Sequence, residues 1–261
     1  MLELRNISVE IEGADGPRKL LTDVAAAFSP GAFHAVIGPS GCGKSTLIKA
    51  IAGLLELSEG SIFWQGRDLE KEDDFSVGEL AYVPQFSIAH EPLTVAESLG
   101  YAIRLRVAGL ADAARRERVR QVLEEVGLLD FAARPVKVLS GGQRRRLALA
   151  LELLSHPALL LCDEATSGLD PRSEDEIVRL LSALARQGSR TVLSVTHSLR
   201  QIGCYDGVTV LYQGRLAFHG HPSHLAGYFG ISDPEEVYDR LAESSPAFWA
   251  EQWNLACGGP V

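Results

Sequence analysis

The sequence predicts an α/β fold built around a phosphate-binding loop. The motif GPSGCGKST at residues 38–46 follows an apolar run, Phe33–Ile37, and precedes a segment whose apolar residues recur at helical spacing. A second apolar run, Leu159–Cys162, ends in Asp163 and Glu164. Short continuous apolar runs are typical of buried strands in a parallel sheet, and their alternation with helical periodicity is typical of α/β proteins.

The first two strands of the chain are predicted to be antiparallel. Residues 2–9 and 20–28 have the composition of strands, and the sequence EGADGP at residues 12–17 supplies the glycines and proline of a turn between them. The strand at Phe33–Ile37 and the loop follow. The next helix is marked by Leu47, Ile51 and Leu54, which recur at i, i+4 and i+7.

The stretch after residue 85 is predominantly helical. Apolar residues at helical spacing mark two helices, with Val119, Leu123 and Val126 in the first and Leu147, Leu151 and Leu154 in the second. Gly127 is expected to stop the first helix. The charged run at residues 115–118, Arg-Arg-Glu-Arg, favours a solvated helix face, with a docking surface as the alternative.

Strands and one long helix complete the predicted core. The strand at Leu159–Cys162 is followed by an amphipathic helix ending near Gly188, a β-branched strand at residues 191–196 and a further strand at residues 208–212. The apolar positions of that helix are Ile177, Leu180, Leu181 and Leu184.

The loop motif matches G-x-x-x-x-G-K-[ST] in the strand, loop and helix context that the motif requires. Gly38, Gly41 and Gly43 let successive N–H groups turn toward one point and form a nest for phosphate oxygens at the positive end of a helix. Lys44 is expected to reach the β- and γ-phosphates, and the Ser45 hydroxyl to ligate Mg²⁺. The alternative, an ordinary glycine-rich turn, leaves the Lys-Ser pair unexplained.

The acidic pair stands where a parallel strand ends, which is the edge at which ligands bind in open α/β sheets. Asp163 is predicted to hold Mg²⁺, and Glu164 to polarise the water that attacks the γ-phosphate. A solvated acidic turn is the alternative. The phosphate loop favours the first interpretation, because that loop already needs a metal partner.

These motifs occur in an order that resembles the nucleotide-binding domain of ABC transporters over about residues 1–220. The ordered set is GPSGCGKST at 38–46, YVPQ ending at Gln85, LSGGQ at 139–143, LLLCDE at 159–164, SGLD at 167–170, and His197 after a β-rich run. The resemblance implies a P-loop NTPase (RecA-like) core with an antiparallel β subdomain and an inserted α-helical signature subdomain at about 87–147. Residues 221–261 would form a C-terminal helical extension.

The resemblance implies an ATPase that uses ATP and Mg²⁺ and works as a head-to-tail dimer. The ATP-binding residues would be Gly38, Pro39, Ser40, Gly41, Cys42, Gly43, Lys44, Ser45 and Thr46, and the signature residues acting on the other subunit's ATP would be Ser140, Gly141, Gly142 and Gln143. A hydroxyl and free N–H groups at a helix start suit anion binding. One chain holds one loop and one signature, so two chains, or one chain and a similar domain, would make two sites.

Three further polar residues take roles from the same resemblance. Gln85 would touch Mg²⁺ and the attacking water, with the segment after it facing a transport partner; the alternative is a polar residue at a strand end. His197 would contact the γ-phosphate and orient Glu164, although a histidine at a strand end is more often a satisfied polar residue. Asp170 would join the two sites across the dimer, a role compatible with capping the helix that opens at Pro171.

The chain departs from the family pattern at the adenine site. Many members stack adenine on an aromatic residue of the first strand, whereas here no Phe, Tyr or Trp precedes Phe28 and the region near Ile11 is aliphatic. Stacking of a base on an aromatic side chain contributes about 1–3 kcal/mol. We therefore expect weak binding to an isolated subunit and little discrimination between ATP and GTP.

Composition favours an enzyme of the cytosol. The chain has 261 residues, of which 46% are hydrophobic and 23% charged, and a formal charge of −9, which does not favour nucleic acid as a partner. The cysteines are Cys42, Cys162, Cys204 and Cys257, without C-x-x-C spacing, and are expected to be reduced thiols. No apolar run reaches the roughly 18 residues of a membrane helix. A cytoplasmic location, peripheral at the inner face of the cell membrane through a permease partner, is expected.

The subfamily resemblance points to G-type (White-like) exporters and their bacterial relatives. It rests on the tract HEPLTVAESLGYAIRLR, the form DEATSGLD and the downstream GRLAFHGHPSHLAGYFG. Trp249 and Trp253 share a helix face and are expected to pack on the ATPase body, with a membrane partner as the alternative.

A non-transport ABC ATPase of the DNA-repair or translation type remains the rival function. A scaffold that holds ATP without hydrolysis is disfavoured by Glu164 and His197.

Overall fold

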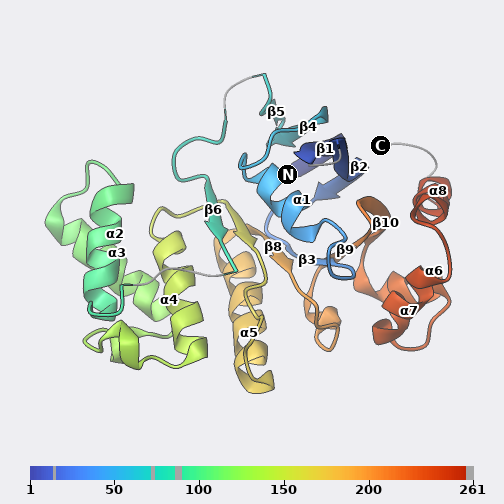
Figure 1. Cartoon of the computed structure of the whole chain (residues 1–261). Helices are drawn as coiled ribbons and strands as arrows, with labels where there is room; N and C mark the ends of the chain where they lie inside the picture. The colour runs from blue at the N-terminus through green and yellow to red at the C-terminus, as the bar shows by residue number, and fades with distance from the viewer. Residues whose placement is uncertain (14–15, 72–73, 86–89, 257–261) are drawn as a thin grey trace.

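The computed structural model describes residues 1–13, 16–71, 74–85 and 90–256. Within these residues, two sheets form the centre of the molecule (Figure 1). The larger sheet has the strand order β10-β9-β3-β8-β7-β6, with bounds β3 (Phe33–Ile37), β6 (Leu80–Val83), β7 (Leu159–Cys162), β8 (Thr191–Val195), β9 (Gly207–Tyr212) and β10 (Arg215–Gly220). The smaller sheet has the order β2-β1-β4-β5, with bounds β1 (Leu2–Gly13), β2 (Gly16–Phe28), β4 (Glu59–Trp64) and β5 (Arg67–Asp68).

The larger sheet is parallel from β9 to β6, and β10 joins it antiparallel to β9. Its strands are buried on both faces, which is why they are continuous apolar runs in the sequence. In β7, Leu160 and Cys162 enter the hydrophobic cluster on one face, and Leu159 and Leu161 enter the cluster on the other. The predicted strands at 33–37 and 159–162 are confirmed, and those predicted at 191–196 and 208–212 are found one residue different, at 191–195 and 207–212.

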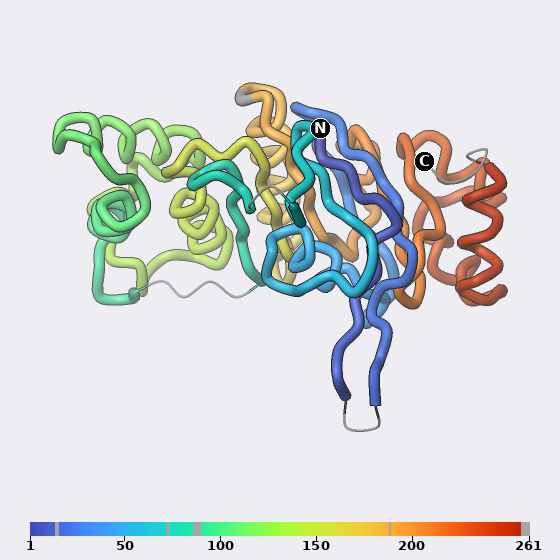
Figure 2. Tube along the Cα trace, turned by 90° about the horizontal axis from the view of Figure 1, so that it is seen from above, coloured from blue at the N-terminus to red at the C-terminus, as the bar shows by residue number. Residues whose placement is uncertain are grey.

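The smaller sheet is antiparallel, as predicted. Strands β1 and β2 pair from Leu2 opposite Phe28 to Gly13 opposite Gly16, so both are longer than the sequence predicts. Part of the predicted turn, residues 14–15, lies outside the described residues. The far ends of the two strands extend beyond the rest of the body (Figure 2). Their exposed, polar sequence made the strand bounds hard to read from apolar patterning alone.

Helices flank the sheets in two groups (Figures 1 and 2). The first group lies beyond β6 and contains α2 (Val95–Arg106), α3 (Asp112–Glu125) and α4 (Gly141–Leu153). The second group lies beside β10 and contains α6 (Leu225–Phe229), α7 (Val237–Ala242) and α8 (Pro246–Ala256). Two further helices, α1 (Lys44–Ile51) and α5 (Pro171–Gly188), cover the larger sheet. The predicted helix through Leu54 is wrong at its end. Helix α1 stops at Ile51, because Gly53 takes a φ of +69°, and Leu54 is 58% exposed.

The charged run on α3 contains one buried residue, which corrects the prediction of a solvated face. Arg118 is 5% exposed. Its guanidinium donates hydrogen bonds to the carbonyls of Leu153 and Leu154 at the end of α4, and to Glu125 at 3.2 Å. The last carbonyls of a helix have no partner within the helix and carry partial negative charge. Arg118 therefore binds α3 to the C-terminal end of α4.

Replacing Arg118 by methionine should lower the free energy of unfolding by about 2–4 kcal/mol, because the Leu154 carbonyl would lose its donor and the Leu153 carbonyl and Glu125 would each lose a charged partner. Urea denaturation followed by circular dichroism measures the change. Arg116→Met, at an exposed position of the same helix, should shift stability by less than about 0.5 kcal/mol. Equal midpoints for the two variants would contradict the assignment.

The C-terminal helices pack on the body of the molecule, as expected for the tryptophan pair. Trp249 is 5% exposed and its Nε1 donates to the Leu241 carbonyl at 3.0 Å. The Trp253 ring lies 5.2 Å from the Phe218 ring of β10. In the described part of the chain, no helix combines the length and apolarity needed to cross a membrane. The cysteines described there, Cys42, Cys162 and Cys204, are free thiols, and Cys257 lies outside the described residues.

Candidate functional site

The predicted site residues gather where parallel strands end. Strand β3 leads into the loop at residues 38–43, β6 is followed by Gln85, β7 by Asp163 and Glu164, and β8 by His197. Since β3, β6, β7 and β8 are parallel, their carboxyl ends share one edge of the sheet. The topology therefore brings together residues that are far apart in the sequence.

The loop curls around the ammonium group of Lys44. The Lys44 Nζ donates to the carbonyls of Gly38 at 2.8 Å and Pro39 at 3.0 Å, and the residue is 5% exposed. Gly43 has a φ of +106° and directly precedes α1, so the loop enters the helix through a conformation that glycine favours. The N–H groups of the first turn of α1 consequently face the loop, which is the arrangement of an anion-binding helix start.

A turn between β9 and β10 supports the loop from behind. The Gly214 N–H donates to the Cys42 carbonyl at 2.8 Å, and the Gly214 carbonyl accepts from the Thr22 N–H at 2.8 Å. A Cβ at Gly214 would lie 2.6 Å from the Leu20 carbonyl oxygen. Burial raises the pKa of the Cys42 thiol, which therefore stays protonated behind the loop. The loop is thus fixed between β2 and the β9–β10 turn.

Ser45 and Asp163 face each other at the start of α1. The Ser45 Oγ donates to Asp163 Oδ1 at 2.8 Å, and the Tyr82 hydroxyl donates to Asp163 Oδ2 at 3.2 Å. Burial, together with the Asp163 charge, raises the pKa of Tyr82 to about 12, so this hydroxyl is a permanent donor near neutral pH. A hydroxyl and a carboxylate are hard oxygen ligands of the kind that Mg²⁺ takes along with phosphate oxygens and water.

Glu164 is held between two polar side chains. Gln85 Nε2 donates to Glu164 Oε2 at 2.6 Å, and His197 Nε2 lies 2.9 Å from Glu164 Oε1. The Glu164 side chain is 17% exposed, and its backbone φ of +54° is a conformation that costs a non-glycine residue of order 1–3 kcal/mol. Strain of this kind persists where the surroundings fix a residue in place. The contacts with Gln85 and His197 orient the carboxylate.

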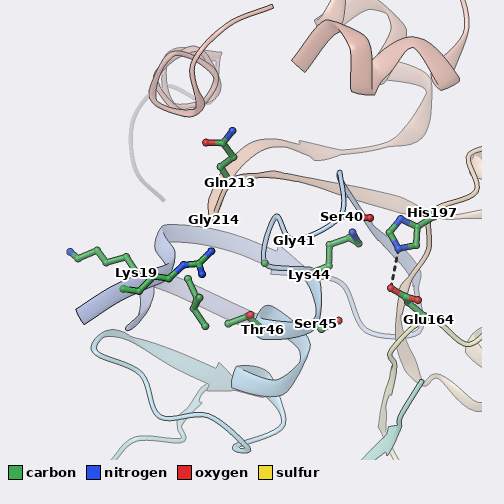
Figure 3. Close-up of a pocket in the computed structure, with 13 residues that line it drawn as sticks. Lys19, Ser40, Gly41, Lys44, Ser45, Thr46, Glu164, His197, Gln213 and Gly214 are labelled. Atoms are coloured by element: carbon green, nitrogen blue, oxygen red, sulfur yellow. Dashed lines mark hydrogen bonds and ion pairs between the residues drawn. The ribbon is translucent and has the colours of Figure 1, made fainter. Parts of the chain in front are cut away.

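A cavity of about 520 Å³ lies over the loop (Figure 3). It is lined by Arg18, Lys19, Leu20, Ser40, Gly41, Gly43, Lys44, Ser45, Thr46, Glu164, His197, Gln213 and Gly214. Of the predicted loop residues, Gly38, Pro39 and Cys42 do not line the cavity. Figure 3 shows Glu164 and His197 on one side of Lys44 and Ser45, with Lys19 on the other. Among the residues that the structure describes, this wall contains no Phe, Tyr or Trp.

The wall residues from β2 and from the β9–β10 turn were missed by sequence reasoning. Arg18, Lys19 and Leu20 belong to a strand whose role the motifs do not mark, and Gln213 follows a strand of the opposite edge. No short motif contains them. The hydrogen bonds of Gly214 to Cys42 and Thr22 link these segments to the loop.

The signature residues lie at the exposed start of α4, away from the cavity. Ser140 Oγ accepts from the Gln143 N–H at 3.3 Å, and Gln143 Oε1 accepts from the Ser140 N–H at 3.0 Å, which is a capping box. A Cβ at Gly142 would lie 3.3 Å from Ser173 Oγ. Asp170 caps α5 through the Arg172 and Ser173 N–H groups, both at 3.1 Å. The structure therefore does not bring Ser140 to the phosphate loop of its own chain.

Comparison with known proteins gives consistent results. A family model described as "ABC transporter" matches residues 21–167. The chain is 37% identical to the ABC transporter ATP-binding/permease protein Rv1747 of Mycobacterium tuberculosis, over 100% of this chain and 30% of that protein. It is 34% identical to the sn-glycerol-3-phosphate import ATP-binding protein UgpC of Chromobacterium violaceum, over 92% of this chain and 61% of that protein. The chain thus spans between about a third and three fifths of these relatives' lengths.

The fold agrees with a solved structure of the same kind. The dimeric, post-hydrolysis structure of the ATP-binding cassette MJ0796 with ADP and Pi superposes with a TM-score of 0.75 and 26% identity, covering 85% of this chain and 99% of that one. The expected P-loop NTPase architecture is thereby confirmed. With its loop, acidic strand end and signature arranged as described, and with more than half of its length matched by the family model, the chain belongs to the ABC transporter family.

Proposed function

We propose that this chain is the ATP-binding and ATP-hydrolysing part of an ABC transporter, which closes on ATP as a head-to-tail dimer and powers a membrane permease. The observation that carries the proposal is the arrangement of Glu164, which lies between Gln85 and His197 at the rim of the cavity over the phosphate loop. We assign residues 1–220 to the ATPase domain, with a helical inset at about 87–147, and residues 221–261 to a C-terminal connector.

The loop would bind the phosphates of ATP. Lys44 and the N–H groups at the start of α1 would contact the β- and γ-phosphates. The Lys44 ammonium group donates to two loop carbonyls in this structure, and charged phosphate oxygens would be stronger acceptors for it. Ser45 and Asp163, with Gln85 nearby, would hold Mg²⁺, whose charge would neutralise that of the phosphates. Among the described residues no cluster of three His, Cys, Asp or Glu side chains could hold a metal alone. A site completed by phosphate oxygens fits this donor set.

Glu164 would act on the water that attacks the γ-phosphate. Its carboxylate already accepts a hydrogen bond from Gln85, and His197 lies at the other oxygen, so its orientation is fixed before substrate arrives. His197 is 43% exposed at the cavity wall, which leaves its ring accessible to the γ-phosphate. Positioning and electrostatic stabilisation are the main contributions to phosphoryl transfer in such sites.

Two observations support a dimer. Ser140 and Gly141 are exposed, and neither lines the cavity of its own chain. An exposed helix start of this kind suits the phosphates of ATP held by a second copy or a similar domain. The related cassette MJ0796 is described as dimeric. Asp170, which caps α5 next to the signature, would then lie at the same interface.

A shallow hydrophobic groove supports a permease partner. The cavity of about 620 Å³ between α2 and α4 is lined by His90, Pro92, Leu93, Ser98, Tyr101, Ala102, Leu105, Arg106 and Leu151. Tyr101 is 54% and Leu105 87% exposed, and both contribute to one contiguous apolar surface in this groove, which is the feature that marks an interaction site. Such a partner would hold the chain at the inner face of a membrane. Because one relative is an import protein, export stays a prediction that rests on subfamily resemblance.

The cavity wall allows a prediction about nucleotide choice. With Arg18, Lys19 and Leu20 in place of an aromatic residue, the stacking contribution of about 1–3 kcal/mol should be missing. We expect weak binding of Mg-ATP to the monomer and a Kd for Mg-GTP within about tenfold of it. Isothermal titration calorimetry with both nucleotides measures the two Kd values. The Lys44→Ala variant serves as a control that gives the heat not due to binding at the phosphate loop. A micromolar and strongly ATP-selective isotherm would contradict the expectation.

The proposed function is tested by the ATPase rate as a function of protein concentration. A specific activity that rises with concentration, saturates, and disappears with Glu164→Gln would support a composite site made by two copies. A specific activity that does not change with concentration would contradict a homodimeric site. If the rate is negligible at all concentrations, a permease partner is added. A rate that still does not increase would contradict the proposed function itself.

A further inference from the structure

Arg145, on α4, lies between the signature and the candidate base. Its Nη1 donates to the Gln85 carbonyl at 2.9 Å and to the Pro84 carbonyl at 3.3 Å. Burial lowers the pKa of the Arg145 guanidinium from its ordinary value, while the neighbouring Cys162 and Glu164 act in the opposite direction. The group nevertheless remains a cation, because the ordinary pKa of arginine lies far above neutrality. A half-buried cation is thus held at the backbone of Gln85.

The two neighbouring arginines of α4 point elsewhere. Arg144 donates to the carbonyls of Lys137 and Leu139, and Arg146 donates to the Val126 carbonyl and to Glu176. A pattern of three consecutive arginines does not reveal this division in the sequence, because residues on successive positions of a helix face different directions.

Arg145 completes a chain of direct contacts from the signature helix to the base. Ser140 caps α4, Arg145 on the same helix binds the backbone of Gln85, and the Gln85 side chain binds Glu164. Helix α4 also contributes Leu151 to the groove beside α2. A rotation of this helix would therefore pull the Gln85 backbone and change where its carboxamide meets the carboxylate.

We propose that Arg145 is a positioning residue that ties the signature helix to Gln85 and so sets the position of Gln85 against Glu164. The inference rests on the proposed ATPase function. A displacement of about 1 Å at a reacting group can cost about 10²-fold in rate, so loss of this link should appear in kcat. Binding of ATP, which depends on the phosphate loop outside this chain of contacts, should change little.

The test is a double-mutant cycle in ATP turnover with Arg145→Gln, Gln85→Ala and the combined variant. Arg145→Gln should lower kcat by about tenfold and leave KM for ATP within about twofold. In the Gln85→Ala background the same change should alter kcat by less than about twofold, because the carboxamide to be positioned is already absent. Arg145→Lys, which keeps the charge and can reach one carbonyl, should give an intermediate kcat. Arg186→Gln, an exposed arginine of α5, is the control.

A merely structural role for Arg145 would lower kcat by the same factor in both backgrounds, and that result would overturn the inference. So would an Arg145→Gln protein that turns over ATP as fast as an active wild type. If Arg145→Gln does not fold, Arg145→Lys takes its place in the cycle with the same two criteria. If the wild-type protein does not turn over ATP even with a permease partner, both the proposed function and this inference are overturned. If the wild type is active and only the criteria for Arg145 are not met, the inference alone fails.

Discussion

Replacing Glu164 by glutamine should reduce ATP turnover by about 10²–10⁴-fold, the usual scale for loss of a general base. Glutamine keeps the shape of the side chain but cannot take a proton from water. The contacts of Lys44 and Ser45 do not involve Glu164, so ATP binding should persist. Closed dimers should consequently accumulate with Mg-ATP, because hydrolysis would no longer reopen them.

Two measurements check this result. Phosphate release gives the turnover, and light scattering after size-exclusion chromatography gives the mass with and without Mg-ATP. Glu251→Gln, an exposed glutamate of α8, removes the same charge away from the cavity and should leave both readouts unchanged. Unchanged turnover in Glu164→Gln would mean that another group acts as the base.

Replacing Gly38 by alanine should lower the free energy of unfolding by about 3 kcal/mol or more and abolish ATP binding. The backbone of Gly38 has a φ of +148°, which side chains rarely allow, and an added Cβ would lie 2.2 Å from the Leu211 carbonyl oxygen and 2.6 Å from Cys42 Sγ. The first of these neighbours is backbone and cannot turn aside. The loop would have to move, and with it the carbonyl that accepts from Lys44.

Gly41→Ala is the matched control in the same loop. Gly41 also has a positive φ, +74°, but a Cβ there would meet nothing within 4 Å. Gly41→Ala should therefore lower the free energy of unfolding only by the cost of a left-handed backbone at alanine, about 1–2 kcal/mol. Chemical denaturation gives the stabilities and titration calorimetry the nucleotide affinities. Equal stabilities for the two variants would show that close packing behind Gly38 is unimportant.

The sequence was informative wherever a local pattern coincides with a tertiary environment. The runs Phe33–Ile37 and Leu159–Cys162 could be assigned because a strand buried on both faces has no polar positions. The polar residues following such strands could then be grouped, because parallel strands end at one edge. Gln85 and His197 were expected at the site of Glu164 from the resemblance of the ordered motifs to the ABC nucleotide-binding domain, and both are found within hydrogen-bonding distance of Glu164.

The sequence failed where a distant segment decides the environment. Arg118 lies in a charged run that predicts exposure, yet the end of α4 supplies buried carbonyls for it. Leu54 continues a helical period, but Gly53 ends the helix before it. Arg18 and Gln213 line the cavity, where the β9–β10 turn binds both the loop and β2. Such contacts depend on the packing of elements that no local pattern relates.

The placement of the aromatic residues has a consequence for spectroscopy. The chain has three tryptophans, Trp64, Trp249 and Trp253, and none of them lines the cavity over the phosphate loop. Trp64 is buried in the antiparallel sheet beside Phe75, whereas Trp249 and Trp253 lie in the aromatic cluster around Phe218, Tyr228 and Phe229. Intrinsic fluorescence should therefore stay almost silent when a nucleotide enters. It should instead report separately, through single-tryptophan variants, on loosening of the antiparallel sheet and on undocking of the C-terminal helices.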